Sequence, residues 1–297
     1  MTTFRFFLDW EPNCQFAGLI WACEKGLFRR AGLNVALVPP SAHPNTTTLD
    51  LVLDGGLCAG CMEENLIVRA VAEGKAIKAI GATMQDSPMH LITLTGSSLR
   101  SLHDLPGRRI AMHGDGEHLL ATVLALHGID GTAVAVTVGG WSLDDLTDGR
   151  FDAVQGYTTT EPHTLARRGI ATHLIPVRHH GLHPWAQMMF AGQTTIDRDG
   201  AALAAFVGAA KTGWREAMGN RDETAAMIAA LSAEHDDAAE NRDILGAMMP
   251  LITGGEGLDR IVATDPERWR RNLATYARFG MIPQAPDYDA VVCETFM

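Results

Sequence analysis

The chain has 297 residues, of which 46% are hydrophobic and 20% are charged. This composition predicts a folded protein of about two domains and excludes a disordered chain. The 24 basic and 35 acidic residues give a formal net charge of −11. An acidic protein repels phosphate backbones and anionic lipids, so we expect neither nucleic acid nor a membrane surface as a partner.

The chain alternates between short apolar runs and longer segments with helical spacing, which predicts strands and helices in turn. In the first part we expect strands at 3–8, 34–38, 55–60 and 77–82, and helices at 15–30 (amphipathic), 45–53 and 63–72. In the middle we expect strands at 90–95, 109–112, 133–138, 153–156 and 172–176, and helices at 117–127, 142–148 and 162–168. The last part predicts a strand at 185–191 and helices at 201–219, 221–231, 242–249 and 266–279.

This order predicts an α/β protein with parallel-rich sheets flanked by helices. The chain is expected to leave one α/β unit near 86–90 and to return to it near 183–189. We therefore predict a discontinuous lobe of residues 1–87 plus 190–297 and a continuous lobe of residues 88–189. Two crossings between the lobes predict a hinge and a ligand cleft at the carboxyl ends of the strands.

No segment approaches the ~18–20 apolar residues that a membrane span requires, so we expect no membrane insertion. The N-terminus lacks a basic start followed by an apolar run. The protein is therefore expected to be periplasmic if a leader has been removed and cytoplasmic otherwise. The five cysteines do not form a disulfide framework. Cys58 and Cys61 lack a second pair, which favours small buried thiols over a redox or metal role.

Three motifs carry a resemblance to a known family. The segment 8–35, LDWEPNCQFAGLIWACEKGLFRRAGLNV, resembles the opening of bacterial substrate-binding proteins that capture thiamine-pyrimidine precursors, and of the related fungal pyrimidine synthase. DAVQGYTTTEP at 152–162 is similar to a second family motif, and MHGDGE at 112–117 more loosely to a third. The resemblance implies the two-lobed type II periplasmic-binding-protein fold, a small heteroaromatic amine-bearing solute in the cleft, and delivery of that solute to an ABC-type permease.

The chain departs from this family at several positions. Phe16 stands where the family has a histidine, which implies a different ligand. The cofactor lysine of the synthase falls on Met62 and its substrate histidine on Leu66. The cysteine-dense run of the synthase corresponds to 179–185, which contains no cysteine. We therefore expect no cofactor and no self-sacrificing synthase chemistry.

Candidate ligand contacts follow the first and third expected strands. Trp10 is expected to stack on a flat heteroaromatic ring, with a core position as the alternative. Asn13 is expected either to bond a ring nitrogen or to cap the following helix. Glu63 and Glu64 are expected either to bind ligand amino groups or to complement the helix dipole.

A glycine-rich loop and a strand end supply further candidates. The loop from Gly114 to Glu117 offers free N–H groups, but its own acids disfavour phosphate, and Asp115 is alternatively a helix cap. Gln155, Tyr157 and Glu161 lie at or just past a strand end. A carboxylate there is suited to accept the N–H bonds of an aminopyrimidine edge.

The histidines give a further interpretation. His179, His180 and His183 lie within five residues and are candidate metal ligands, although no acidic partner or helical spacing accompanies them. We favour a hinge-loop or ligand-contacting role for these histidines, with Trp185 as a second ring platform. The expected ligand contacts are Trp10, Asn13, Phe16, Met62, Glu63, Glu64, His90, Gly114, Asp115, Gly116, Glu117, Gln155, Tyr157, Glu161, His183 and Trp185.

The sequence favours a solute-binding protein for ABC-type uptake. The alternative is a cytoplasmic enzyme of pyrimidine or thiamine-precursor metabolism on the same scaffold, with a histidine-bound metal. A third alternative is a cytoplasmic sensor of the same ligand, for which the same sequence features are expected.

Overall fold

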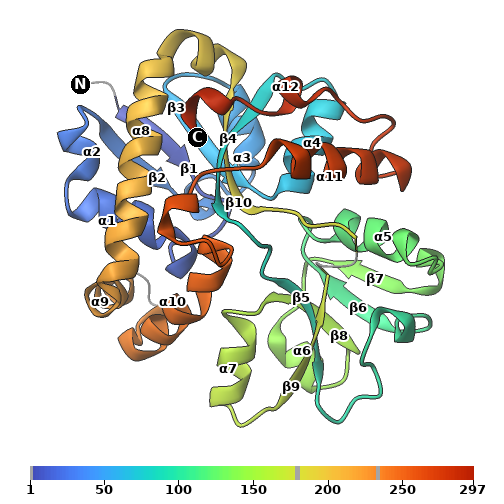
Figure 1. Ribbon diagram of the computed structural model, residues 1–297. Coiled ribbons are helices and arrows are strands. Elements are labelled where there is room, and N and C mark those ends of the chain that lie inside the picture. The colour runs from blue at the N-terminus through green and yellow to red at the C-terminus, as the bar shows by residue number, and fades with distance from the viewer. Residues whose placement is uncertain (1–2, 178–180, 232–234) are drawn as a thin grey trace. The chain divides into compact units, whose positions relative to one another are not determined.

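The computed structural model describes residues 3–177, 181–231 and 235–297 (Figure 1). Its contacts divide the chain into two compact units. The first unit comprises Met1–Asp86, Trp185–Pro266 and Pro286–Met297, and the second comprises Ser87–Pro184 and Glu267–Ala285. Within the described ranges, no helix is both long and apolar enough to span a membrane.

The first unit contains a five-stranded sheet in the order β2-β1-β3-β10-β4. Its strands are β1 (Thr3–Phe7), β2 (Asn34–Val38), β3 (Cys58–Met62), β4 (Ile77–Met84) and β10 (Ala186–Gly192). β1 is parallel to β2 and β3, whereas β10 lies between β3 and β4 and is antiparallel to both. The sheet is therefore mixed rather than purely parallel. The expected domain boundary between residues 189 and 190 falls within β10.

Helices cover this sheet. They are α1 (Ala17–Glu24), α2 (Leu27–Arg30), α3 (Thr48–Leu53), α4 (Glu64–Ala72), α8 (Gln193–Gly219), α9 (Arg221–Leu231), α10 (Ala238–Thr253) and α12 (Tyr288–Val291). The single amphipathic helix predicted at 15–30 is wrong. Gly26, with φ of 68°, separates α1 from α2, and α1 is buried over six successive residues rather than along one face. The shift of β3 from the predicted 55–60 has a similar cause, because Gly55 and Gly56 adopt left-handed φ values of 93° and 92° that suit a turn.

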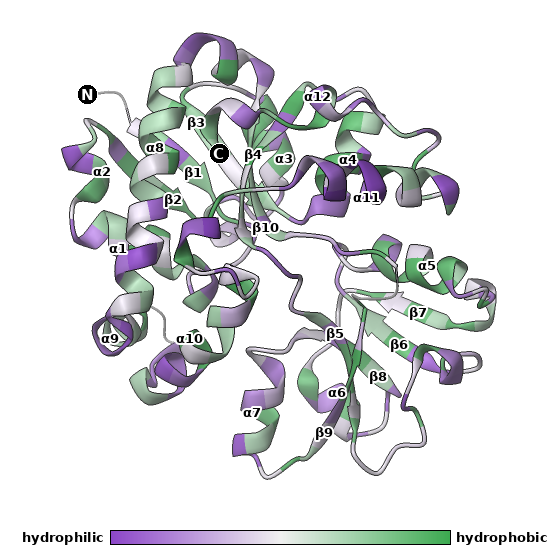
Figure 2. Cartoon of the chain, viewed as in Figure 1, coloured by the Kyte–Doolittle hydropathy of each residue, from purple (hydrophilic) through white to green (hydrophobic). Residues whose placement is uncertain are grey.

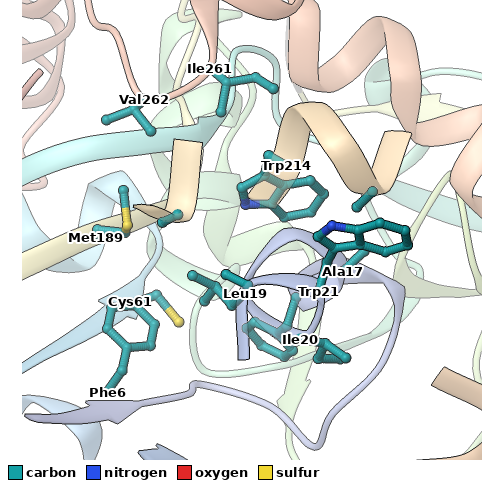
Figure 3. Close-up of a cluster of buried hydrophobic side chains, with 14 of the residues drawn as sticks. Phe6, Ala17, Leu19, Ile20, Trp21, Cys61, Met189, Trp214, Ile261 and Val262 are labelled. Atoms are coloured by element: carbon teal, nitrogen blue, oxygen red, sulfur yellow. The ribbon is translucent and has the colours of Figure 1, made fainter. Parts of the chain in front are cut away.

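The core of the first unit lies where α1 and α8 pack together and against the sheet (Figure 3). In Figure 3 the side chains of Phe6, Cys61 and Met189 come from the sheet, and Trp21 and Trp214 from the two helices. The helices approach closely at two glycines. A Cβ on Gly18 would lie 2.2 Å from the Trp214 ring, and one on Gly213 would lie 2.2 Å from the Gly18 carbonyl oxygen. Only glycine fits this crossing at both positions.

The second unit contains a sheet in the order β7-β6-β8-β5-β9. Its strands are β5 (Met89–Leu94), β6 (Arg109–Met112), β7 (Ala135–Val138), β8 (Ala153–Tyr157) and β9 (Thr172–Pro176), and its helices are α5 (Glu117–Leu126), α6 (Leu143–Thr147), α7 (Glu161–Arg167) and α11 (Pro266–Arg278). β6 is parallel to β7 and β8, and β5 is antiparallel to β8 and β9. Because β6 and β8 are parallel, their carboxyl ends reach the same edge of the sheet.

Hydropathy follows this architecture (Figure 2). The strands are largely apolar, whereas α11 is mostly hydrophilic in Figure 2 and buries only one face. That face carries Trp269, Leu273 and Tyr276, spaced four and three residues apart as one side of a helix requires.

Candidate functional site

The loop after β1 places Asp9 at the centre of a hydrogen-bond network in the first unit. Its carboxylate accepts a bond from the Gln187 side-chain amide, with Nε2 3.1 Å from Oδ2, and a weaker one from the Cys61 thiol, with Sγ 3.4 Å from Oδ1. Burial, and then the charge of Asp9, raise the pKa of Cys61 well above its usual value. The thiol therefore stays protonated and acts as a donor.

Gln187 is a candidate site residue that the sequence did not reveal. It lies within β10 but has a φ of 51°, a left-handed conformation that is uncommon outside glycine and costs on the order of 1–3 kcal/mol. Its backbone N–H donates to Glu63 Oε1 at 3.3 Å while its side chain holds Asp9. Strained residues of this kind gather at functional sites, and Gln187 fixes the orientation of the Asp9 carboxylate.

Glu63, Glu64 and Trp185 are buried and hydrogen-bonded within the first unit. Glu64 is fully buried, and its Oε2 accepts the backbone N–H of Trp185 at 2.8 Å. The Trp185 indole is also fully buried and donates to Gln85 Oε1 at 3.2 Å. These bonds anchor the chain at the start of β10. The ligand contacts of both glutamates and the ring platform at Trp185 stay predictions.

The three candidate ligand contacts near the N-terminus differ in how far their side chains are buried. Trp10 is 47% exposed, so its indole is not a core side chain. Asn13 is buried, and its Oδ1 accepts the N–H of Gln15 at 2.7 Å, which supports the capping interpretation. Phe16 is 1% exposed and packs in the hydrophobic core, and its ligand contact stays a prediction.

A cavity of about 430 Å³ lies wholly within the first unit, beside the ends of β1, β2 and β3. Met62 and Leu66, the positions that correspond to the lysine and histidine of the synthase, both line it. Its walls are Leu8, Asp9, Val38, Pro39, Pro40, Thr46, Thr47, Thr48, Leu49, Leu51, Met62, Leu66, Arg69, Ala70 and Glu73. The volume lies in the usual range for small-molecule pockets.

In the second unit, Gln155 organises the loop that follows β6. Its buried side chain accepts the backbone N–H of His113 and donates to Asp115 Oδ1, each at 2.9 Å. Gly116 leaves room for this amide, because a Cβ there would lie 2.1 Å from Gln155 Oε1, whereas Gly114 has open space around it. The structure thus brings the predicted residues of this loop together with Gln155.

The same loop holds an aromatic contact. The His113 ring packs against Trp141, with centroids 4.6 Å apart. Burial lowers the pKa of His113, and the nearby charge of Asp115 opposes this shift. Glu117 begins α5, where a negative charge complements the helix dipole.

Glu161 follows β8 as predicted. Its Oε2 accepts the backbone N–H of Tyr157 at 2.7 Å, and its carboxyl group packs over Gly156, where a Cβ would lie 2.9 Å from Oε2. Burial raises the pKa of Glu161, and the charge of Asp115 raises it further. Asp115 and Glu161 therefore act on each other as like charges. Tyr157 itself is 9% exposed.

The histidine candidates divide into two groups. His179 and His180 lie outside the described residues. His183 is exposed, and its carbonyl oxygen accepts bonds from Arg268 Nε at 2.7 Å and Asn272 Nδ2 at 2.8 Å, both on α11. His90 lies buried in β5, with Nδ1 3.0 Å from the Pro88 carbonyl oxygen, so Nδ1 carries the proton of this bond. Among the described residues, no group of three or more His, Cys, Asp or Glu side chains could hold a metal ion.

Comparison with known proteins identifies the family. A model described as NMT1/THI5 like matches residues 13–224. The chain belongs to the NMT1/THI5-like family. The match includes the His113–Glu117 loop, Gln155, Glu161 and Gln187, so most of the polar residues described above lie within it.

Two curated relatives are named for the binding or the synthesis of a pyrimidine. The formylaminopyrimidine-binding protein of Halalkalibacterium halodurans is 25% identical over 228 residues, which cover 75% of this chain and 68% of that protein. The 4-amino-5-hydroxymethyl-2-methylpyrimidine phosphate synthase of Legionella pneumophila is 27% identical over 139 residues, or 46% of this chain and 43% of that protein. Across the first curated relatives, the chain matches 43% to 68% of their length, about half.

A solved structure confirms the fold. The alkanesulfonate-binding protein SsuA of Xanthomonas axonopodis pv. citri, bound to MOPS, matches with a TM-score of 0.72 over 97% of each chain, at 17% sequence identity. The predicted periplasmic-binding-protein fold, with two helix-flanked sheets, is therefore correct. The inter-lobe cleft stays a prediction.

Proposed function

We propose that this protein binds a small, flat, amine-bearing heteroaromatic solute of the thiamine-pyrimidine class and releases it chemically unchanged. Family membership, the fold, and the formylaminopyrimidine-binding relative support a solute-binding role. In the full proposal the protein serves ABC-type uptake and hands the solute to a permease. That role requires a position outside the cytoplasmic membrane, which fractionation of the source cells checks.

The observation that carries the proposal is the pair of acids Asp115 and Glu161 at the strand ends of the second unit. Burial of the Glu161 carboxylate, with a smaller contribution from the charge of Asp115, makes its ionised form unfavourable in the folded state. Such an arrangement is typical of a functional site, where the charge is needed for a ligand. A carboxylate accepts the two N–H groups that an aminopyrimidine edge offers, and binding relieves the repulsion.

The first unit carries its own exposed aromatic ring beside an acid. Trp10 is exposed and follows directly after Asp9, whose carboxylate is oriented by Gln187 and Cys61. An indole face stacks on a flat ring with a gain of about 0.5–1.5 kcal/mol beyond the area buried.

Trp10 gives a sharp test by calorimetry with 4-amino-5-hydroxymethyl-2-methylpyrimidine and its formylamino analogue. We expect Trp10→Ala to weaken binding about two- to tenfold. Since the indole is half exposed, the free energy of unfolding is expected to change by less than about 0.5 kcal/mol.

Trp10→Phe is the matched control, because it keeps an aromatic face and is expected to restore much of the affinity. Equal affinity in Trp10→Ala and the unmodified protein would show that the indole does not contact the ligand.

A second candidate function is an enzyme of the same metabolism, which the synthase relative favours. The apolar side chains of Met62 and Leu66 in the cavity of the first unit supply neither an amine for a cofactor nor an imidazole for a substrate. Stoichiometric metal in protein purified without a histidine tag, together with turnover of the pyrimidine, would favour the enzyme.

A further inference from the structure

We propose that the cavity of the first unit is a subsite for an apolar, ring-sized substituent on the solute. The inference rests on the proposed function for the identity of the amine-bearing ring. The subsite itself is argued from the walls of the cavity, which lie within the first unit.

The deepest walls of the cavity are apolar. Leu8 at the end of β1 is 1% exposed and Met62 at the end of β3 is 5% exposed. Leu66 and Ala70 lie one turn apart on the same face of α4, and Leu51 contributes from α3. An apolar group that enters this space leaves water for hydrocarbon contacts, which is favourable in proportion to the area buried.

Three polar side chains of the cavity wall are hydrogen-bonded within the protein. Thr48 Oγ1 donates to the Leu8 carbonyl oxygen at 3.1 Å, and Thr47 Oγ1 donates to Asp50 Oδ2 at 2.7 Å. Asp9 accepts from Gln187 and Cys61 as described above. The cavity therefore offers apolar surface in the main, and a polar substituent would lose water without full replacement of its hydrogen bonds.

The charged residues of the wall belong to its rim. Arg69 and Glu73 form an i,i+4 ion pair with Nη2 3.8 Å from Oε1, and their side chains are 30% and 58% exposed. The geometry points to a ligand that places an alkyl or aryl group in the cavity and its polar part toward this charged rim.

The test compares 4-aminopyrimidines that carry a methyl or a benzyl group, at C2 and at C5, by calorimetry. We expect at least one benzyl compound to bind tenfold or more tightly than its methyl counterpart. Ala70→Phe fills the cavity and is expected to reduce this gain to threefold or less. Ala72→Phe, on the same helix but outside the cavity wall, is the matched control and should keep the gain.

A second variant covers the case in which Ala70→Phe does not fold. Leu66→Asn places an amide on the wall at a half-buried position and is expected to remove most of the benzyl gain. A gain that survives in both cavity variants, or equal affinity of the methyl and benzyl compounds in the unmodified protein, would overturn the subsite.

Benzylamine separates the subsite from the proposed function. If the methyl pyrimidines bind and the benzyl group adds nothing, the subsite is wrong and the proposed function stands. If benzylamine binds and Leu66→Asn weakens it while no pyrimidine binds, the subsite stands and the proposed function is wrong. Binding of none of these compounds overturns both.

Discussion

Replacing Gly213 by alanine is expected to lower the free energy of unfolding by about 3 kcal/mol, the upper part of the usual range for overpacking. The new Cβ would lie 2.2 Å from the Gly18 carbonyl oxygen and 2.8 Å from the Ala22 Cβ. The nearest of these is a backbone atom of a buried helix, so rotation of a side chain cannot relieve the clash. The two helices must separate, and Trp214 loses its contacts across the same interface.

Gly208 on the same helix provides the matched control for urea denaturation. No atom lies within 4 Å of the position that its Cβ would occupy. Gly208→Ala is therefore expected to stabilise the protein by about 0.5–1 kcal/mol, because alanine loses less conformational freedom in a helix. Similar stabilities for the two alanine variants would contradict the close crossing of α1 and α8.

Glu161→Gln is expected to stabilise the protein and to weaken its binding of an aminopyrimidine. Burial raises the pKa of Glu161 in the folded state above its value in the unfolded state. At pH values between these two pKa values, the folded protein binds more protons than the unfolded protein. Stability therefore falls as the pH rises through this range, and the ionised carboxylate remains unfavourable at pH 7. Glutamine stays neutral and can still accept the Tyr157 N–H. The melting temperature of Glu161→Gln should therefore exceed that of the unmodified protein at pH 7. Below the ordinary pKa of glutamate, where Glu161 is also neutral, the two melting temperatures should be similar.

Binding is expected to change in the opposite direction. Loss of the charged acceptor should weaken 4-amino-5-hydroxymethyl-2-methylpyrimidine binding about tenfold to a hundredfold, the range for a hydrogen bond to a charged group. Glu267→Gln, at the start of α11, is the control, because its side chain is 83% exposed and it is not among the expected ligand contacts. Lower stability at pH 7 together with unchanged affinity would make Glu161 a purely structural residue.

The sequence predicted the fold because its signals are local. The alternation of apolar runs and helical segments indicated both sheets, and the predicted limits of β6, β9 and α9 match the structure. A strand was predicted at 185–191, but the place of β10 in the sheet had no such local signal. It inserts antiparallel between β3 and β4, from more than 100 residues later in the chain. That insertion buries Glu64 and Trp185, which looked like ligand contacts in sequence.

The difference between local sequence signals and contacts between distant residues also explains which parts of the candidate site were predicted. The sequence pointed separately to Asp115 in a glycine-rich loop and to Gln155 and Glu161 at a strand end. The structure brings Asp115 and Gln155 into contact because the strands before them, β6 and β8, are parallel and adjacent. Gln187 could not be predicted, because a left-handed glutamine inside a strand leaves no pattern in the sequence. The burial of Phe16 could not be predicted either, because the family motif marks its position while α1, which follows it, is buried over six successive residues.

Native mass spectrometry of the protein mixed with 4-amino-5-hydroxymethyl-2-methylpyrimidine tests most directly whether the protein binds such a solute without changing it. We expect one molecule per chain, released on denaturation with its mass unchanged, and a weaker complex with Glu161→Gln. A released compound of altered mass, or no complex at concentrations that saturate the formylaminopyrimidine-binding relative, would contradict the account.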